Sequence, residues 1–238
     1  MTLFYGTWTI MDASRVPCMT YFASMSAADD ARESAGVEIL GRWSDIGTAS
    51  GHVICRADSY ENVVSWLYNW VPMATCAVKP ICDDNVAREI VLKARPSYQV
   101  SYNNVGDETQ PGETMYAINY SFYEGKRVQG AQAFANLTQE QDQGDSGNCR
   151  PLGRWHDLGN GTGFAIACAK SEADVYRWAN NWAEMCECSI VPVLTDYKAR
   201  RVIQQKPDFT QKLKEVQKMF KPPSPFLNKS WLYTCCTW

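Results

Sequence analysis

The residues best suited to chemistry in this sequence are Arg154 and His156, in the run Arg154-Trp155-His156-Asp157. Alternate side chains of a strand share a face, so Arg154 and His156 point one way and Trp155 and Asp157 the other. If the first pair faces a closed space between two sheets, it can bind an anionic or enol-like ligand, with His156 as the base. In the alternative interpretation, Trp155 fills the core and Arg154 forms a salt bridge at the surface.

A second candidate feature is a pair of tryptophans four residues apart in each half of the chain, Trp66 with Trp70 and Trp178 with Trp182. This spacing places both indoles on one helical face. They would either clamp a flat ligand or pack between helix and sheet, and packing is the commoner arrangement. The ligand-binding set predicted from these features is Trp155, Asp157, Arg42, Trp43, Trp178, Trp182 and Asn181.

Several other site classes lack their sequence patterns. The ten cysteines include no Cys-x-x-Cys pair, and no histidine–carboxylate cluster repeats at ligand spacing, so we predict no metal site and no cofactor. The glycine-rich stretch 159–163 joins two strands, which argues against a phosphate-binding loop before a helix. A net charge of −3 argues against a general nucleic-acid binder.

The sequence indicates neither a membrane segment nor a secretory signal. It has no apolar run of about eighteen residues, the length that a spanning helix needs. Residues 1–15 lack a basic start and a long apolar stretch. Reduced, partly buried thiols then account for the cysteines, and we expect a cytoplasmic protein.

The elements that must position these residues occur twice. A shift of 112 positions aligns residues 5–91 with 117–203 without a gap. The identical pairs include Gly41/Gly153, Arg42/Arg154, Trp43/Trp155, Asp45/Asp157, Gly51/Gly163, Trp66/Trp178, Asn69/Asn181, Trp70/Trp182, Asp84/Asp196 and Arg88/Arg200. A repeat of fixed period predicts two copies of one supersecondary unit.

Hydrophobic periodicity gives each copy the order β-α-β-β-α-β, which is the ferredoxin-like arrangement. In the first copy we predict strands at 3–11, 37–45, 52–57 and 76–82, with helices at 15–32 and around Val63–Trp70. In the second copy we predict strands at 115–123, 149–157, 164–169 and 188–194, a helix at 126–143, and a second helix opened by a capping box at Ser171–Asp174. Each sheet has one bare face, so we expect the two bare faces to meet within one chain.

The predicted fold is therefore α+β, with two tandem ferredoxin-like units forming an intramolecular, pseudo-dimeric α/β barrel. The units span 1–92 and 114–204, with a linker at 93–113 and a C-terminal helix and aromatic tail at 205–238. The tail helix and the residues after it carry a predicted partner-docking set of Phe209, Leu213, Val216, Phe220, Trp231, Tyr233 and Trp238.

Each unit resembles an uncharacterised family of small domains that carry a GRWHD-like hairpin followed by a W-x-x-x-W helix. The resemblance covers residues 5–91 and 115–203, and the second unit keeps Gly153-Arg-Trp-His-Asp157 intact. In the first unit Ser44 stands where the pattern has His156, which puts a reaction there in doubt. This family is similar to the dimeric α/β-barrel superfamily, which includes cofactor-independent monooxygenases, lactone isomerases, haem-degrading enzymes and stress-response proteins. Such a fold does not by itself transfer a function.

Two functions follow as hypotheses. In the first, which the sequence favours, the protein is a non-catalytic binding or assembly component that docks on a protein partner or larger assembly through its C-terminal helix and aromatic tail. In the second, it is a cofactor-independent enzyme of monooxygenase or isomerase type that uses His156 and Arg154 on a small apolar or anionic ligand. The first is favoured because no acid–base pair repeats and the tail has no place in a minimal barrel enzyme. A connected pocket of about 300 Å³ or more that reaches Arg154 and His156 would favour the second, and a solidly packed interface between the sheets would favour the first.

Overall fold

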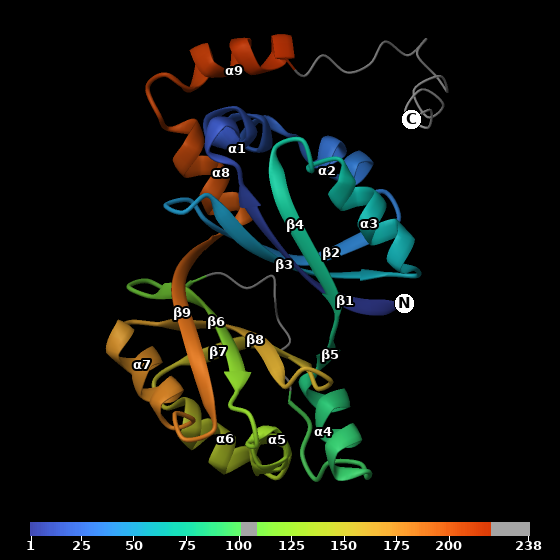
Figure 1. Cartoon of the computed structure of the whole chain (residues 1–238). Coiled ribbons are helices and arrows are strands. Elements are labelled where there is room, and N and C mark those ends of the chain that lie inside the picture. Colours follow the sequence, from blue (N-terminus) through green and yellow to red (C-terminus); the bar gives the residue numbers. More distant parts are fainter. Residues whose placement is uncertain (101–108, 220–238) are drawn as a thin grey trace.

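The computed structural model describes residues 1–100 and 109–219, which form two similar units with helices on the outer face of each sheet (Figure 1). The first unit comprises β1 (Thr2–Ile10), a 3-10 turn (Asp12–Ser14), α1 (Arg15–Ser24), α2 (Ala27–Glu33), β2 (Val37–Asp45), β3 (Ser50–Ala57), α3 (Tyr60–Tyr68) and β4 (Ala74–Pro80). The second comprises β6 (Thr114–Phe122), α5 (Arg127–Ala135), α6 (Gln139–Ser146), β7 (Arg150–Asp157), β8 (Thr162–Ala169), α7 (Glu172–Asn180) and β9 (Cys186–Thr195). The predicted ferredoxin-like order of both units is confirmed.

The two units exchange the ends of their last strands. Nine strands follow the order β4-β1-β3-β2-β9-β6-β8-β7-β5, in which β5 is the short strand Cys82–Asp83. Strand β9 leaves β6 and pairs with β2, while β5 pairs with β7 in the other unit. The sheet is not closed, because its two end strands, β4 and β5, do not pair with each other. They follow one another in the chain, with Ile81 between them. The predicted barrel is therefore an open one.

The bare sheet faces meet and form a shared core. It contains Tyr5, Trp43 and Ile54 from the first unit together with Trp155 and Phe164 from the second. The ring centroids of Trp43 and Trp155 are 6.2 Å apart, a separation at which aromatic pairs attract. One polypeptide thus covers both faces, as the repeat predicts.

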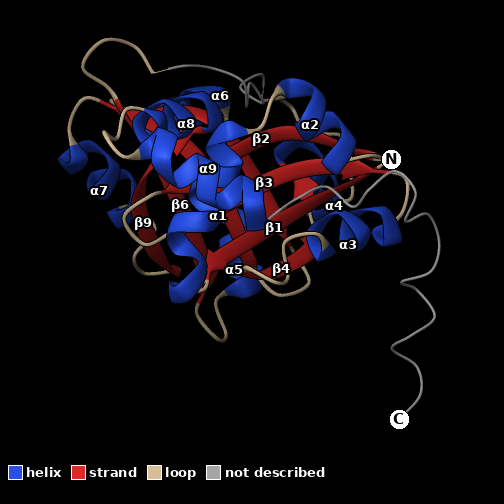
Figure 2. Ribbon diagram, turned by 90° about the horizontal axis from the view of Figure 1, so that it is seen from above, coloured by secondary structure: helices blue, strands red, loops and turns tan. Residues whose placement is uncertain are grey.

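The helices also cross between units (Figure 1). Helix α4 (Asp84–Leu92) follows β5 and packs on α5 of the second unit. Helix α8 (Asp196–Gln204) follows β9 and packs on α1 of the first unit. Figure 2 shows α8 and α1 from above, with the following helix α9 (Phe209–Met219) lying over them. Each unit therefore supplies one helix to the surface of the other.

The long helices predicted at 15–32 and 126–143 are each two shorter helices, because a strong cap starts a new helix inside each range. The Ser26 hydroxyl accepts a hydrogen bond from the Asp29 amide, and the Asp29 carboxylate accepts one from the Ser26 amide. Thr138 and Gln141 form the same capping box before α6. Such reciprocal caps satisfy backbone groups that a helix start leaves unpaired, and so favour a new helix at this point. At α7, Ser171 instead caps the Ala173 amide, so the box predicted with Asp174 does not form.

Candidate functional site

Trp155 sets the orientation of the Arg154–Asp157 segment. Its side chain is 3% exposed and packs between the sheets against Phe164. Because side chains alternate along β7, Arg154 and His156 lie on the opposite face, among side chains of α5 and α7. The hypothesis that this pair faces the space between the sheets is therefore wrong. The alternative is wrong for Arg154, which is buried and not at the surface.

His156 is held between two hydrogen-bonding partners. Its Nε2 lies 2.6 Å from Asp84 Oδ1, and its Nδ1 lies 2.6 Å from the hydroxyl of Tyr120. Asp84 arrives there because Cys82 of β5 pairs directly with His156, and α4 begins immediately afterwards. Side chains from α4, β7 and β6 thus form one continuous chain, Asp84–His156–Tyr120.

Gly163 provides the space that the Tyr120 ring occupies. The two residues pair across β6 and β8, and a Cβ at Gly163 would lie 2.1 Å from Tyr120 Cε1. Gly51 does the same in the first unit, where a Cβ would lie 2.1 Å from Trp8 Cζ2. These repeated glycines therefore serve close ring packing as well as the turns that precede them.

Burial and charge fix the protonation states in this chain. Burial lowers the pKa of His156 and outweighs the opposite effect of its hydrogen bond to Asp84, so the imidazole is neutral. Burial alone would raise the pKa of Asp84, but the Arg154 charge and the hydrogen bonds from His156 and Arg154 hold that pKa below its usual range. Burial raises the pKa of the Tyr120 phenol. His156 therefore donates its Nε2 proton to the Asp84 carboxylate and accepts the Tyr120 proton at Nδ1.

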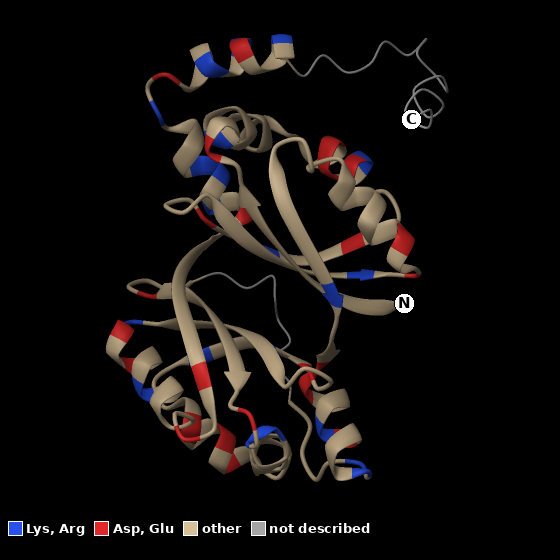
Figure 3. Ribbon diagram, viewed as in Figure 1, with Lys and Arg blue, Asp and Glu red and all other residues tan. Residues whose placement is uncertain are grey.

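Buried ion pairs surround the hydrogen-bonded residues Asp84, His156 and Tyr120. Arg154 donates two hydrogen bonds of 2.8 Å to Asp84 and reaches Asp142 at 3.0 Å. Asp142 also accepts from Tyr98 at 2.5 Å and lies 3.4 Å from Arg88. Two carboxylates thus balance two guanidiniums in the interior, whereas most charged residues lie on the helices at the outer surface (Figure 3). Arg88 Nε is the one buried side-chain polar atom of the described residues without a hydrogen-bond partner, and it lies 3.8 Å from Asp84. Removing a partner from such a buried cluster is costly.

A pocket of about 70 Å³, half open to solvent and smaller than the roughly 300 Å³ expected of an enzyme cavity, lies beside Tyr120, His156 and Arg154. Its other walls are mostly apolar and come from Ile118, Phe122, Phe134, Ala165, Trp178, Ala179, Trp182, Cys186 and Cys188. Asp145 accepts hydrogen bonds from the indoles of Trp178 and Trp182 at 2.9 and 2.8 Å and so fixes both rings. The site combines an apolar, aromatic enclosure with one proton-carrying wall.

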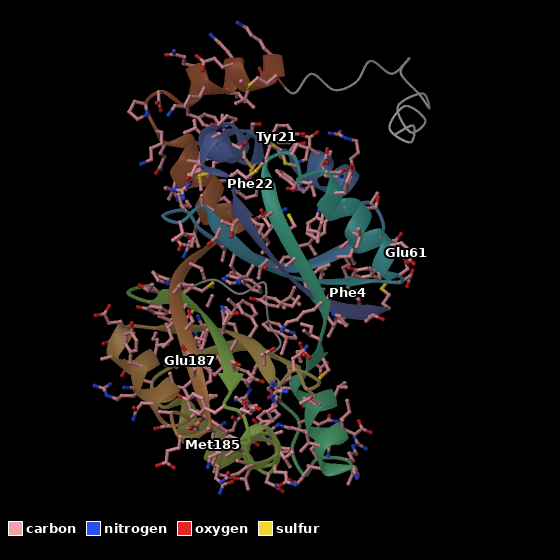
Figure 4. All side chains as sticks on the ribbon, viewed as in Figure 1. Phe4, Tyr21, Phe22, Glu61, Met185 and Glu187 are labelled. Atoms are coloured by element: carbon pink, nitrogen blue, oxygen red, sulfur yellow. The ribbon has the colours of Figure 1, made fainter. Side chains whose placement is uncertain are left out.

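The charged framework is repeated in the first unit. Arg42 donates hydrogen bonds to Asp196 and to Asp30, and Arg200 lies 2.6 Å from Asp30. Arg42 and Arg200 both lie over the ring of Phe22, at 5.1 and 4.3 Å from its centroid, and Figure 4 labels this residue, which α1 carries. These residues match Arg154, Asp84, Asp142, Arg88 and Phe134 after the shift of 112. Each framework takes one carboxylate and one guanidinium from the exchanged helix.

The other predicted ligand-binding residues divide into two groups. Arg42 lines a matching cavity in the first unit, and Trp178 and Trp182 line the cavity of the second. The remaining ones lie elsewhere: Trp43 and Trp155 fill the core between the sheets, Asp157 caps the following turn and pairs with Lys79 at 3.1 Å, and Asn181 binds Asp145.

Sequence reasoning missed Asp84, Asp142 and Tyr120 as functional residues. Asp84 matches Asp196 in the repeat, and Asp142 matches Asp30, so retention of a carboxylate at both positions was the available signal. Tyr120 has no such signal, because its counterpart is Trp8. Its role depends on the fold bringing β6 and β7 to the same cavity.

Residues 2–95 and 114–207 each match one domain family, described as a domain of unknown function (DUF3303). The chain belongs to this family, as a tandem pair of its domains. No curated protein sequence matches the chain.

Solved structures with a similar arrangement are distant in sequence. One is a putative monooxygenase from Lactobacillus acidophilus, with 8% identity and a TM-score of 0.43, covering 82% of this chain and 95% of the other. Another is a DypB variant of Rhodococcus jostii in complex with heme, with 7% identity, a TM-score of 0.49 and coverages of 84% and 95%. A third is a putative chlorite dismutase, with 9% identity, a TM-score of 0.43 and coverages of 85% and 100%.

The hypothesis of a non-catalytic docking component is wrong. The apolar face of α9, which the sequence predicts to dock on a partner, packs on α1 of the same chain, with Val216 buried and Phe209 and Leu213 half-buried, so this face is already covered. The other predicted docking residues lie outside the described residues: Phe220, Trp231, Tyr233 and Trp238. Within the described residues, 1–100 and 109–219, no helix is both long and apolar enough to cross a bilayer.

Proposed function

We propose that the protein is a cofactor-independent enzyme that removes a proton from a small, mostly apolar molecule bound in the second-unit cavity. The observation that supports this most directly is the chain Asp84–His156–Tyr120, which ends at the cavity wall. A neutral imidazole between a carboxylate and a phenol is an arrangement that moves a proton without building up an isolated buried charge.

The direction of transfer follows from the protonation states. Tyr120 uses its proton to bind His156 Nδ1, so its oxygen lone pairs are left to accept a proton from the ligand. As the ligand proton arrives on Tyr120, the phenolic proton passes to Nδ1, and the ionised Asp84 stabilises the resulting imidazolium. The electron pair of the broken bond stays on the ligand. The ligand must therefore form a delocalised anion, as an enolisable ketone or a phenol does.

We assign Arg154 a positioning role, since its two hydrogen bonds hold Asp84 in line with His156. We further propose that the run Gly153–Asp157 is the functional motif of this family. A Cβ at Gly153 would lie 2.1 Å from Trp155 Cη2, so glycine gives room to the indole that fixes the face of the strand. Trp155 then directs Arg154 and His156 toward the cavity.

The fate of the anion separates two reaction types. Return of the proton to a different atom is an isomerisation and needs no further reactant. Oxygenation needs dioxygen, and the ligand supplies all four electrons: a CH2 group becomes a carbonyl, which keeps one oxygen atom, and the two hydrogens of that group leave with the other oxygen atom as water. Oxygen uptake during turnover distinguishes the two.

We also propose a cytoplasmic location and the division into units 1–92 and 114–204 joined by 93–113. In the described part of the chain, all eight cysteines are free thiols, which supports a reducing compartment. Secretion of the protein with oxidised cysteines would contradict this proposal.

The proposed activity is tested with 2-tetralone, an enolisable bicyclic ketone, by following exchange of its α-protons in deuterated water by NMR. Wild-type protein should accelerate exchange above the buffer rate. His156→Gln should lower the catalysed rate about 100-fold or more, the usual contribution of a positioned base. The matched control Ser44→Ala changes the corresponding residue of the first unit and should leave the rate unchanged. Equal rates for wild type and His156→Gln would exclude this mechanism.

A further inference from the structure

The first unit contains a cavity that matches the second in position and size. It also measures about 70 Å³, and it lies between the sheet and the helices of that unit. Trp8, Phe22, Arg42, Ser44, Trp66 and Trp70 line it, and they match Tyr120, Phe134, Arg154, His156, Trp178 and Trp182 of the second cavity. The enclosure is therefore duplicated, while the proton-carrying residues are not.

The equal size is kept although the lining residues differ. Ser44 and Ile10 are smaller than their counterparts His156 and Phe122. In the opposite direction, Trp8 is larger than Tyr120, and Leu67 is larger than Ala179. Each pocket is half open to solvent, so a ligand can enter it without a change in the fold.

One polar group on the wall of this cavity lacks a partner. Ser44 is only 8% exposed, lines the cavity, and its hydroxyl forms no hydrogen bond within the described ranges 1–100 and 109–219. The Ser44 oxygen is open to the pocket and not sealed in the core, so a ligand oxygen can reach it and form a hydrogen bond with it. The neighbouring Arg42 is already bound to Asp196 and Asp30, so the cavity offers a neutral polar contact and not a free charge.

We propose that the first-unit cavity is a second ligand site, which binds a flat apolar molecule carrying one hydroxyl or carbonyl oxygen and leaves it unchanged. The indoles of Trp8, Trp66 and Trp70 and the ring of Phe22 suit an aromatic ligand. No proton transfer follows, because a serine and a tryptophan replace the imidazole and the phenol.

Binding there joins the two units. Ala199 and Ile203 of α8 line the cavity together with residues of the first unit, although α8 follows the last strand of the second. A ligand that contacts both segments binds the folded chain better than the unfolded one, so it raises the melting temperature.

The test is the number of 2-naphthol molecules bound, measured by isothermal titration calorimetry. This bicyclic phenol has the shape of the enol of 2-tetralone and carries one hydroxyl group. Wild-type protein should bind two molecules. Ala179→Leu places in the second cavity the residue that the first unit carries, and it should leave one bound molecule that raises the melting temperature.

Two variants block the first cavity, Ser44→Leu and Leu67→Trp, so the test stands if one of them does not fold. Each should weaken binding of one naphthol about tenfold or more, which is a loss of about 1.4 kcal/mol, and should leave proton exchange of 2-tetralone intact. No binding by wild-type protein, or folded Ser44→Leu and Leu67→Trp variants that bind naphthol as wild type does, would overturn the inference. A single bound naphthol that these variants lose would support it, and a single one that only Ala179→Leu loses would overturn it. The binding count needs no turnover, so it stands or falls separately from the proposed reaction.

Discussion

The two halves of the molecule bury the same charged framework but differ in how deeply they bury it. In the second half the Asp84 side chain is fully buried and Arg154 is 8% exposed. In the first half Asp196 is 32% exposed and Arg42 is 9% exposed. Both frameworks join a strand of one unit to the helix that the other unit supplies. The framework therefore holds the exchanged helix in place in each half, and this role requires no reaction.

The proposed chemistry depends on two residues beside this framework. Tyr120 and His156 in the second half stand where the first half has Trp8 and Ser44. In the proposed reaction, an aspartate that holds an exchanged helix also becomes the end of a proton path, because an imidazole lies beside it. The following predictions use each half as the control for the other.

The largest effect on stability is expected from Asp84→Ala. The change leaves Arg154 buried with one carboxylate too few, and removing one partner of a buried ion pair costs about 3–5 kcal/mol. Asp196→Ala should cost clearly less, because water reaches that carboxylate. Urea unfolding of both variants measures the difference. A loss for Asp196→Ala equal to that for Asp84→Ala would mean that the two frameworks are equivalent.

The fold itself was largely predictable, because the repeat fixed the element order and the meeting of two bare faces. The orientation of His156 was not, since alternation along a strand says which side chains share a face and not which face is inside. Trp155 decided it by filling the core. The contact of Asp84 with His156 could not be predicted either, because the two residues lie 72 positions apart and only the pairing of the exchanged β5 with β7 brings them together.

A second prediction concerns the stability of the fold at low pH. Burial lowers the pKa of His52 to about 4, and burial also lowers the pKa of His156. Below pH ~6.5 these histidines become protonated in the unfolded chain but stay neutral in the folded one. The free energy of unfolding therefore decreases as the pH is lowered, by up to ~1.4 kcal/mol per pH unit for each histidine. For His52 this loss runs from about pH 6.5 to about 4. Unfolding free energies measured between pH 8 and 4 should show it.

The matched variant His52→Phe takes the residue found at Phe164 in the second half. This variant should lose the part of the pH dependence of unfolding free energy that is due to His52 and keep the part due to His156. A pH dependence identical to that of wild type would show that His52 is not a buried neutral histidine.

A smaller effect is expected at the tryptophan pairs. Asp145 binds the indoles of Trp178 and Trp182, so Asp145→Ala leaves two donors without their acceptor. We expect a loss of about 1–3 kcal/mol in unfolding free energy. Glu33 is the counterpart of Asp145, and its carboxylate binds neither indole of the first unit. Glu33→Ala should therefore change stability by less than about 0.5 kcal/mol. Chemical denaturation of the two variants tests this, and the reverse ranking would contradict the account.

The central claim is that proton transfer belongs to the second half alone. It is tested most directly by the rate of α-proton exchange of 2-tetralone for Tyr120→Phe beside Trp8→Phe, each with a thermal melt to show folding. The account predicts that Tyr120→Phe loses the catalysed exchange, by about 100-fold or more, while Trp8→Phe keeps it. Exchange that survives Tyr120→Phe, or that both variants lose to the same extent, would contradict it.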